Sequence, residues 1–174
     1  MTLILVTGPP GAGKSTIARG LAGSFGRSVL IEGDAFFAFI ARGAITPWTP
    51  EAHQQNETVT RAGGAAAGRY VAGGFGCVYD GVVGPWFLPD FLASTGLDSL
   101  HYAVILPPED QCVAQVASRT GHGFTDEGAA RHLYRDFATA GAAGRHLFVN
   151  PPGQVADTVR DILDRARGGT LRYP

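Results

Sequence analysis

Lysine is almost absent from this sequence. Of the 14 basic residues in the 174-residue chain, one is a lysine, Lys14, and the others are arginines. The 15 acidic residues leave a net charge of −1, so the chain has no excess of positive charge with which to bind nucleic acid or an anionic membrane. We therefore expect neither as a partner.

Cysteine is also scarce. The two cysteines, Cys77 and Cys112, are too few and too far apart for a disulfide framework or a metal site. Both lie in apolar stretches and are predicted to be buried free thiols, which suits a reducing cytoplasm. The first residues lack the pattern of a signal peptide, and no apolar run approaches the ~18 residues of a membrane span. We expect a cytoplasmic protein.

Strand-like and helix-like segments alternate along the chain, whose length suits a single domain over residues 1–174. Because the strands are separated by helices, we expect a parallel sheet with helices on both faces. Residues 168–174 are expected to form a frayed tail. Strands are predicted at 3–7, 28–31, 75–79, 102–106 and 147–149, and helices at 15–24, 35–42, about 49–71, 109–118, 126–140 and 154–165, with 85–94 helical or irregular. Gly63, Gly64 and Gly68 weaken the prediction of a continuous helix over 49–71.

A glycine-rich segment, residues 8–16, connects the first strand to the first helix. Its sequence, GPPGAGKST, fits the phosphate-loop pattern G-x-x-x-x-G-K-[S/T]. Backbone N–H groups of such a loop and the start of the following helix surround phosphate groups, and glycine permits the close approach. The predicted nucleotide-binding residues are Gly8, Pro9, Pro10, Gly11, Ala12, Gly13, Lys14, Ser15 and Thr16.

The single lysine has a specific task in this loop. Lys14 is predicted to reach the β- and γ-phosphates of a nucleotide as a compact point charge, and Ser15 to bind Mg²⁺ through its hydroxyl. The broad planar guanidinium of an arginine does not replace an ammonium at so tight a site. This requirement explains why a chain that otherwise uses arginine has its lysine here.

Two aspartates lie just beyond predicted strands: Asp34 three residues after the strand 28–31, and Asp80 immediately after the strand 75–79. The carboxyl ends of parallel strands meet at the ligand-binding edge of a sheet, so both are expected near the phosphate loop. Asp34 is predicted to accept a proton from a substrate hydroxyl or to orient it, although an aspartate before a helix is also a favoured cap. Asp80 is predicted to bind Mg²⁺ or the substrate, although Asp-Gly after a strand also describes a simple turn.

A polar, glycine-containing segment, residues 119–125, precedes the helix at 126–140. It is predicted to close over the nucleotide as part of a lid at about residues 119–135. Arg119 is then a catalytic and nucleotide-binding candidate, because it would stabilise charge on the transferring phosphoryl group. Arg131 and Arg135 share one helix face, which serves either the site or a solvated surface.

The order of these motifs resembles the small phosphate-loop kinases, which include nucleoside monophosphate kinases, shikimate and gluconate kinases, chloramphenicol phosphotransferase and zeta toxins. The resemblance spans almost the whole chain and is most specific at the phosphate loop. It implies a three-layer αβα sandwich around a five-stranded parallel sheet in the order 2-3-1-4-5, with ATP and Mg²⁺ as cofactors. It also implies that the adenine lies between Arg119 and the loop after the last strand, at Asn150, Pro151 and Gly153.

Within that group, the chain is most similar to chloramphenicol phosphotransferase and zeta toxin-like small-molecule kinases, which place an aspartate like Asp34 as the base. Nucleoside monophosphate kinases hold the phosphate of their acceptor with several arginines, whereas residues 34–86 offer only Arg42, Arg61 and Arg69. Aromatic residues are plentiful there instead. The predicted acceptor-site residues are Asp34, Phe37, Trp48, Arg61, Asp80 and Trp86, while Phe36 and Phe39 are expected in the core.

These features predict an ATP-dependent phosphotransferase that acts on a hydroxyl of a small, partly apolar molecule, such as an antibiotic or a metabolite. Two alternatives remain at this stage. One is a nucleotide-binding NTPase or regulator without an acceptor, which would not need Asp34. The other is a nucleoside monophosphate kinase. A monomer or a homodimer is expected.

Overall fold

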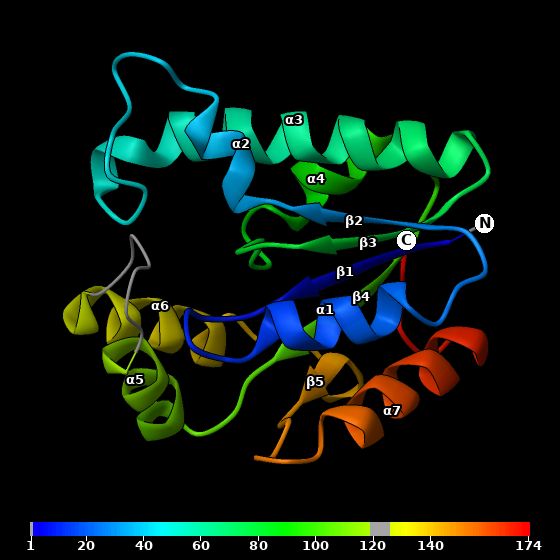
Figure 1. Ribbon diagram of the computed structural model, residues 1–174. Helices are drawn as coiled ribbons and strands as arrows, with labels where there is room; N and C mark the ends of the chain where they lie inside the picture. Colours follow the sequence, from blue (N-terminus) through cyan, green and yellow to red (C-terminus); the bar gives the residue numbers. More distant parts are fainter. Residues whose placement is uncertain (1, 119–125) are drawn as a thin grey trace.

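The computed structural model describes residues 2–118 and 126–174, and strands and helices mostly alternate along them (Figure 1). The strands are β1 (Leu3–Thr7), β2 (Ser28–Glu32), β3 (Gly76–Asp80), β4 (Leu100–Ile105), β5 (Leu147–Phe148) and β6 (Arg172–Tyr173). The α-helices are α1 (Lys14–Ala22), α2 (Asp34–Ala38), α3 (His53–Ala72), α4 (Leu88–Thr95), α5 (Glu109–Ala117), α6 (Glu127–Thr139) and α7 (Val155–Arg167). Short 3-10 helices lie at Pro50–Ala52 and Gly144–His146.

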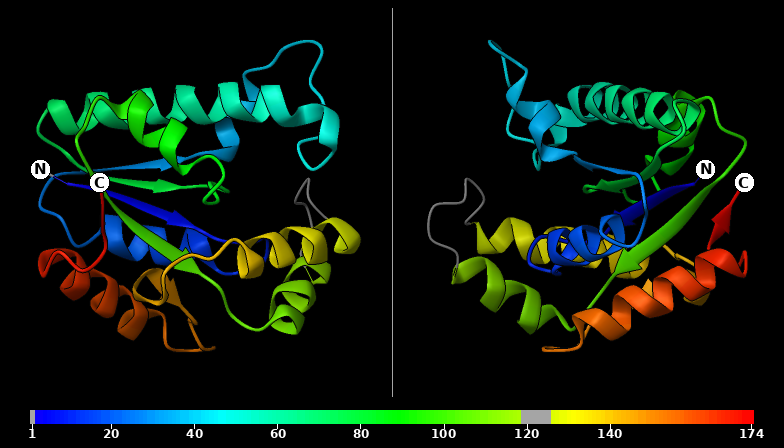
Figure 2. Two further views of the ribbon diagram at one scale, coloured as in Figure 1. Left: turned by 180° about the vertical axis from the view of Figure 1, so that it is seen from behind. Right: turned by 45° about the vertical axis from the view of Figure 1, so that its right-hand side comes forward.

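The sheet has the predicted parallel order β2-β3-β1-β4-β5. Its central strand, β1, is buried along its whole length, because both faces of the sheet are covered. Leu3 and Leu5 belong to one apolar core, and Ile4 and Val6 to the other, as the two-residue period of a strand requires. Helices α3 and α4 cover one face, and α1 and α7 cover the opposite face (Figures 1 and 2). The three-layer architecture is therefore confirmed.

Helix α3 is continuous through the three glycines that weakened its prediction. The glycines serve close packing. A Cβ atom at Gly68 would overlap the carbonyl oxygen of Thr95, and one at Gly64 would lie 2.6 Å from the carbonyl oxygen of Phe91. Both carbonyls belong to α4, so the glycines let α3 lie unusually near its neighbour.

Helix α2 is shorter than the predicted 35–42, because it ends at Ala38. Phe36 packs against the core, but the expectation that Phe39 is a core residue is wrong, since 74% of Phe39 is exposed. The reason is local. The helix stops before its apolar face can extend over the sheet.

The expectation of a frayed tail at 168–174 is also wrong. Leu171 is fully buried, and Arg172–Tyr173 forms the antiparallel strand β6 on Leu100 and His101 of β4. A strand of two residues is too short to show the alternation of apolar and polar residues by which strands are predicted from sequence. The single apolar residue Leu171 anchors it.

Backbone contacts bring the carboxyl ends of β1, β2 and β3 together at one edge of the sheet. The Gly33 N–H donates to the Asp80 carbonyl oxygen at 2.7 Å, and the Gly81 N–H donates to the Val6 carbonyl oxygen at 3.2 Å. The Thr7 hydroxyl accepts a hydrogen bond from the Val83 N–H at 2.9 Å. Among the described residues, no helix combines the length and the apolar character needed to cross a membrane.

Candidate active site

The phosphate loop follows β1 and opens α1, as predicted. Gly8 has φ = +141°, and a Cβ there would overlap the carbonyl oxygen of Ile105. Gly13 has φ = +86° and caps α1. Both positions require glycine, because other residues rarely adopt these backbone angles. Lys14 is the first residue of α1, and its ammonium donates to the Pro9 carbonyl oxygen at 3.0 Å. The lysine side chain thus folds back over the loop that is predicted to bind the phosphates of a nucleotide.

Asp80 is the last residue of β3 and is 7% exposed. Burial raises the pKa of its carboxyl group, while the charge of Lys14 and a hydrogen bond with Ser15 oppose that rise. Its Oδ1 is buried without a hydrogen-bond partner among the described residues. A buried carboxylate oxygen beside a serine hydroxyl fits a Mg²⁺ ion, which prefers oxygen ligands.

The described residues contain no group of three or more His, Cys, Asp or Glu that could hold a metal ion unaided. This fits Mg²⁺ bound with a nucleotide, because that ion uses one or two protein oxygens together with phosphate oxygens and water. The assignment of Ser15 and Asp80 to Mg²⁺ stays a prediction.

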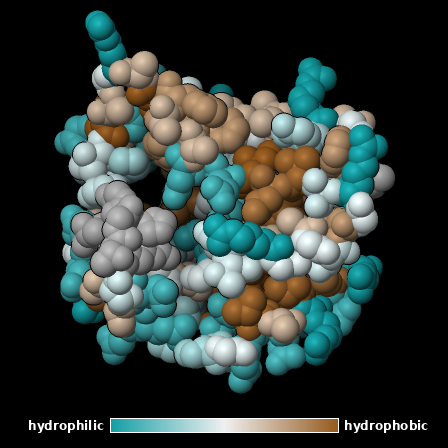
Figure 3. All heavy atoms as spheres, in the orientation of Figure 1, coloured by the Kyte–Doolittle hydropathy of each residue, from teal (hydrophilic) through white to brown (hydrophobic). Residues whose placement is uncertain are grey.

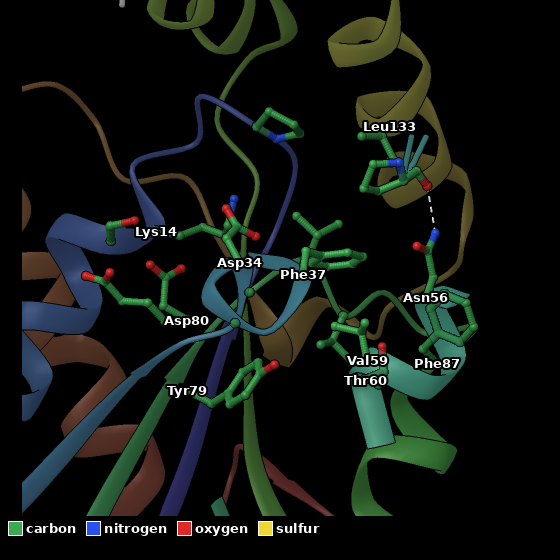
Figure 4. A pocket seen from close by; sticks show the side chains of 18 of the residues that line it. Lys14, Asp34, Phe37, Asn56, Val59, Thr60, Tyr79, Asp80, Phe87 and Leu133 are labelled. Atoms are coloured by element: carbon green, nitrogen blue, oxygen red, sulfur yellow. Dashed lines mark hydrogen bonds between the residues drawn. The ribbon is translucent and has the colours of Figure 1, made fainter. Parts of the chain in front are cut away.

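Asp34 is the first residue of α2, and Gly33 rather than Asp34 occupies the capping position. Its carboxylate therefore does not act as the helix cap that the sequence allowed as an alternative. Lys14, Asp34 and Asp80 gather on the same side of the pocket, although they come from α1, α2 and β3 (Figure 4). Together with Ser15, these residues form what we call the phosphate-loop end.

A cavity of about 780 Å³ extends away from the phosphate-loop end. Figure 3 shows the surface hollowed beneath the apolar residues over α2. We define the aromatic end of the cavity by nine other lining residues: Phe37, Pro47, Trp48, Asn56, Val59, Thr60, Trp86, Phe87 and Leu133. The charged residues among the described lining lie on α1, at the ends of β2 and β3, and at the start of α2: Lys14, Arg19, Glu32, Asp80 and Asp34. The described residues of the aromatic end are uncharged.

Most of the predicted acceptor residues meet in this cavity. Phe37, Trp48 and Trp86 line its aromatic end. The Trp86 ring also packs against Phe137 of α6, with ring centroids 5.1 Å apart. These three aromatic residues therefore line the same cavity as Asp34, and their role toward an acceptor stays a prediction.

The predicted arginines that the structure describes do not line the cavity. Arg61 lies on α3 with its side chain 55% exposed, paired with Glu57 at 2.6 Å and with Asp90 at 2.7 Å, and it is not part of the lining. Arg131 of α6 pairs with Glu109 of α5 at 3.4 Å, so it joins the helices that precede and follow residues 119–125 in the sequence. Arg135 is exposed and does not line the cavity. Arg119 lies outside the described residues.

The loop after β5 lies on the other side of the phosphate loop. Asn150 and Pro151 line a separate hollow of about 360 Å³, to which Gly153 does not contribute. Asn150 is buried, and its Oδ1 accepts a hydrogen bond from the Thr158 hydroxyl at 3.2 Å. A Cβ at Gly13 would lie 2.9 Å from the Asn150 Nδ2, so this side chain packs directly against the phosphate loop. Its role toward adenine stays a prediction.

Several lining residues were missed from the sequence: Pro47, Asn56, Val59, Thr60, Tyr79 and Leu133. The spacing of Asn56, Val59 and Thr60 was an available clue, because these positions share one face of a helix, and Gly63 continues that face. Tyr79 lies on the floor of the cavity, packed against Gly33 and Gly63. Burial and the nearby charges of Asp34 and Asp80 raise the pKa of its phenol, which therefore stays neutral.

No protein-family model and no curated protein matches the chain. Solved structures do resemble it. An unliganded sugar kinase from Janibacter sp. HTCC2649 has a TM-score of 0.70 at 21% identity, with 97% of each chain covered. A gluconokinase from Sinorhizobium meliloti 1021 has a TM-score of 0.65 at 21% identity, covering 95% of this chain and 92% of that one. The tunicamycin resistance protein of Deinococcus radiodurans has a TM-score of 0.68 at 14% identity, covering 99% and 98%. At these identities, the likeness shows that the chain has the fold of the small phosphate-loop kinases.

Proposed function

We propose that this protein is an ATP-dependent kinase that transfers the γ-phosphoryl group to a hydroxyl of a small, uncharged, partly apolar molecule. The observation that carries the proposal is the polarity of one cavity. Lys14, Asp34 and Asp80 stand at its phosphate-loop end, whereas the described residues of its aromatic end are uncharged. Kinases named for a sugar and for gluconate share the fold and support phosphoryl transfer to a small molecule.

The proposal gives each group a role. The acceptor oxygen attacks the γ-phosphorus, the bond from that phosphorus to the bridging β,γ-oxygen breaks, ADP leaves, and the hydroxyl proton passes to the Asp34 carboxylate. Lys14 neutralises charge on the β- and γ-phosphates. Ser15 and Asp80 would hold Mg²⁺, which would supply further positive charge to the phosphates. From the sequence, Arg119 is proposed to stabilise the negative charge on the transferring phosphoryl group.

The chemistry of the aromatic end favours an uncharged acceptor. An acceptor with its own phosphate or carboxylate needs a cation to replace lost water contacts, since burying an unpaired anion is strongly unfavourable. Arg42, Arg61 and Arg69 all lie outside the described lining, so the proposal of a nucleoside monophosphate kinase has no support from arginines between α2 and β3. An antibiotic or another hydroxylated metabolite with an apolar body fits better.

The test is a transfer screen with γ-³²P-labelled ATP and Mg²⁺. The panel contains uncharged aromatic and alicyclic alcohols, sugar acids and nucleoside monophosphates. We expect labelled product from an uncharged alcohol, and a background of phosphate release that is slower than transfer. Release without transfer to any alcohol would indicate an NTPase, and preferential transfer to a monophosphate or a sugar acid would contradict the proposed acceptor class.

A further inference from the structure

One face of α3 forms a wall of the aromatic end. Asn56, Val59 and Thr60 all line the cavity, and they lie three and four residues apart on the helix. Deeper along the same face, a Cβ at Gly63 would overlap the Tyr79 hydroxyl. The glycine therefore lets α3 lie directly on the floor of the cavity, which fixes the position of Asn56 relative to that floor.

Two adjacent amide side chains of α3 tie down the loop that carries Pro47 and Trp48. The Gln55 side chain pairs with the backbone of Ile45, accepting from its N–H at 2.7 Å and donating to its carbonyl oxygen at 2.7 Å. The Asn56 Nδ2 donates to the Pro47 carbonyl oxygen at 2.6 Å. These three hydrogen bonds fix the loop that forms the opposite wall of the aromatic end.

The bond to Pro47 also fixes which way the Asn56 amide faces. Exchanging its oxygen and nitrogen would place Oδ1 against the Pro47 carbonyl oxygen, and two acceptors repel one another. Figure 4 shows Asn56 with its nitrogen directed along this bond and its oxygen turned to the side, at the end of the pocket away from Lys14. That Oδ1 is buried and has no hydrogen-bond partner among the described residues.

An unpaired amide oxygen at a cavity wall needs an explanation, because proteins rarely leave a buried acceptor unsatisfied. The Asn56 Nδ2 donates to the loop at Pro47, whereas its Oδ1 remains available to accept a hydrogen bond from a ligand. The neighbours Val59, Phe87 and Leu133 offer apolar contact. A ligand that fits this wall therefore has an apolar body and a hydrogen-bond donor.

We propose that Asn56 determines acceptor specificity by accepting, through Oδ1, a hydrogen bond from a second hydroxyl or N–H group of the acceptor. This inference rests on the proposed kinase function and narrows its substrate class. The acceptor carries two polar groups on an uncharged frame: the hydroxyl beside Asp34 that receives the phosphoryl group, and a donor at the far end that Asn56 recognises.

The chain provides a matched control in the adjacent residue. Gln55 ties the same loop but does not line the cavity, so Gln55→Ala loosens the loop and leaves the acceptor atom in place. Asn56→Leu keeps nearly the same shape and removes the acceptor atom. Asn56→Asp keeps an oxygen acceptor and removes the donor to Pro47, which covers the case in which the leucine variant fails to fold.

Binding is measured with two probes that differ by one hydroxyl at the far end of an uncharged ring, the diol 4-(2-hydroxyethyl)cyclohexanol and the mono-alcohol 2-cyclohexylethanol. The chain has two tryptophans, Trp48 and Trp86, and both line the cavity, so intrinsic fluorescence reports binding without any phosphoryl transfer. The wild-type protein is expected to bind the diol about 3- to 10-fold more tightly than the mono-alcohol, the usual effect of one neutral hydrogen bond. Asn56→Leu should abolish this preference, whereas Gln55→Ala and Asn56→Asp should retain it even if both probes bind more weakly.

The outcomes separate this inference from the proposed function. A preference for the diol that survives in Asn56→Leu overturns the inference, as does a wild-type protein that shows no preference or binds neither probe. An Asn56-dependent preference in a protein that transfers phosphate to no alcohol would overturn only the proposed function.

Discussion

The two ends of the cavity are built in different ways. At the phosphate-loop end, the nucleotide cradle is one continuous segment, residues 8–16, with its single lysine, and Asp34 and Asp80 join it from α2 and β3. The aromatic end is assembled from α2, the loop before α3, α3 itself, the segment after β3, and α6. The first is held by close backbone packing, and the second by side-chain contacts between separate elements.

The difference teaches where chemistry and selectivity reside in this protein. Phosphate groups are the same in every nucleotide, so a fixed backbone cradle suffices to bind them. Acceptors differ in shape and polarity, and a wall made from several elements can change at one position without disturbing the loop. We therefore expect substitutions at the two ends to have separable effects.

Lys14→Ala tests the phosphate-loop end and should have the largest effect. Transfer and background hydrolysis should both fall by at least about 10²- to 10³-fold, because the γ-phosphate loses its main counter-charge. Lys14→Arg should rescue little, since its planar guanidinium fits the loop poorly. Turnover is measured by release of labelled phosphate and by product formation, with circular dichroism as the folding control. Near-normal transfer in the alanine variant would refute the assignment of the loop.

Asp80→Asn should lower turnover by about 10²-fold, because the carboxylate is assigned to Mg²⁺ binding. The same variant should unfold at a temperature a few degrees higher near neutral pH. Burial raises the Asp80 pKa, so the folded state is penalised above that pKa, and the penalty disappears as the pH falls below the unfolded-state value. Thermal unfolding near neutral pH and in acid checks the sign. A variant less stable than wild type at neutral pH would show that the Asp80 charge supports the fold.

Trp48→Ala tests the aromatic end and should have a moderate effect. The KM for the acceptor identified in the transfer screen should rise about 10-fold, since losing on the order of 50 Å² of apolar contact at about 25 cal/mol/Å² costs about 1.3 kcal/mol. The KM for ATP should not change. Steady-state kinetics with each substrate varied in turn provide the measurement, and an equal rise in both values would contradict the separation of the two ends.

Arg61→Ala should have the smallest effect. Its side chain pairs with Glu57 and Asp90 outside the cavity, and such exposed ion pairs contribute little to stability. Both KM values and kcat should stay at the wild-type level. A selective rise in the KM for the acceptor would return Arg61 to the acceptor site that the sequence predicted for it.

The same contrast explains how much could be predicted from the sequence. The strand order was implied by the resemblance to the small phosphate-loop kinases. The phosphate loop followed from its motif, and the placement of Asp34 and Asp80 followed from the rule that parallel strands end at one edge. Trp48 and Trp86 were identified because turn residues surround them, which made a core position improbable. These predictions depend on local sequence.

The missed residues depend on tertiary packing. Asn56 and Thr60 read as ordinary polar positions of a helix, and only the placement of α3 against the sheet turns them into a wall. Arg61 lies on the same helix, but its side chain pairs with Asp90 outside the cavity. The position of the arginine in the sequence did not show which way it would face. Leu133 lines the cavity because α6 packs beside that cavity. The residues of α6 and α3 that line it together are far apart in the sequence.

The measurement that tests the central claim most directly compares Asp34→Asn with the wild-type protein in two assays, acceptor phosphorylation and the dissociation constant of ATP. If Asp34 is the base for an acceptor hydroxyl, transfer falls by about 10²- to 10⁴-fold, while ATP affinity and slow background hydrolysis persist. A joint collapse of transfer and ATP affinity would place Asp34 in nucleotide or metal binding. Unchanged transfer would contradict its role as the base.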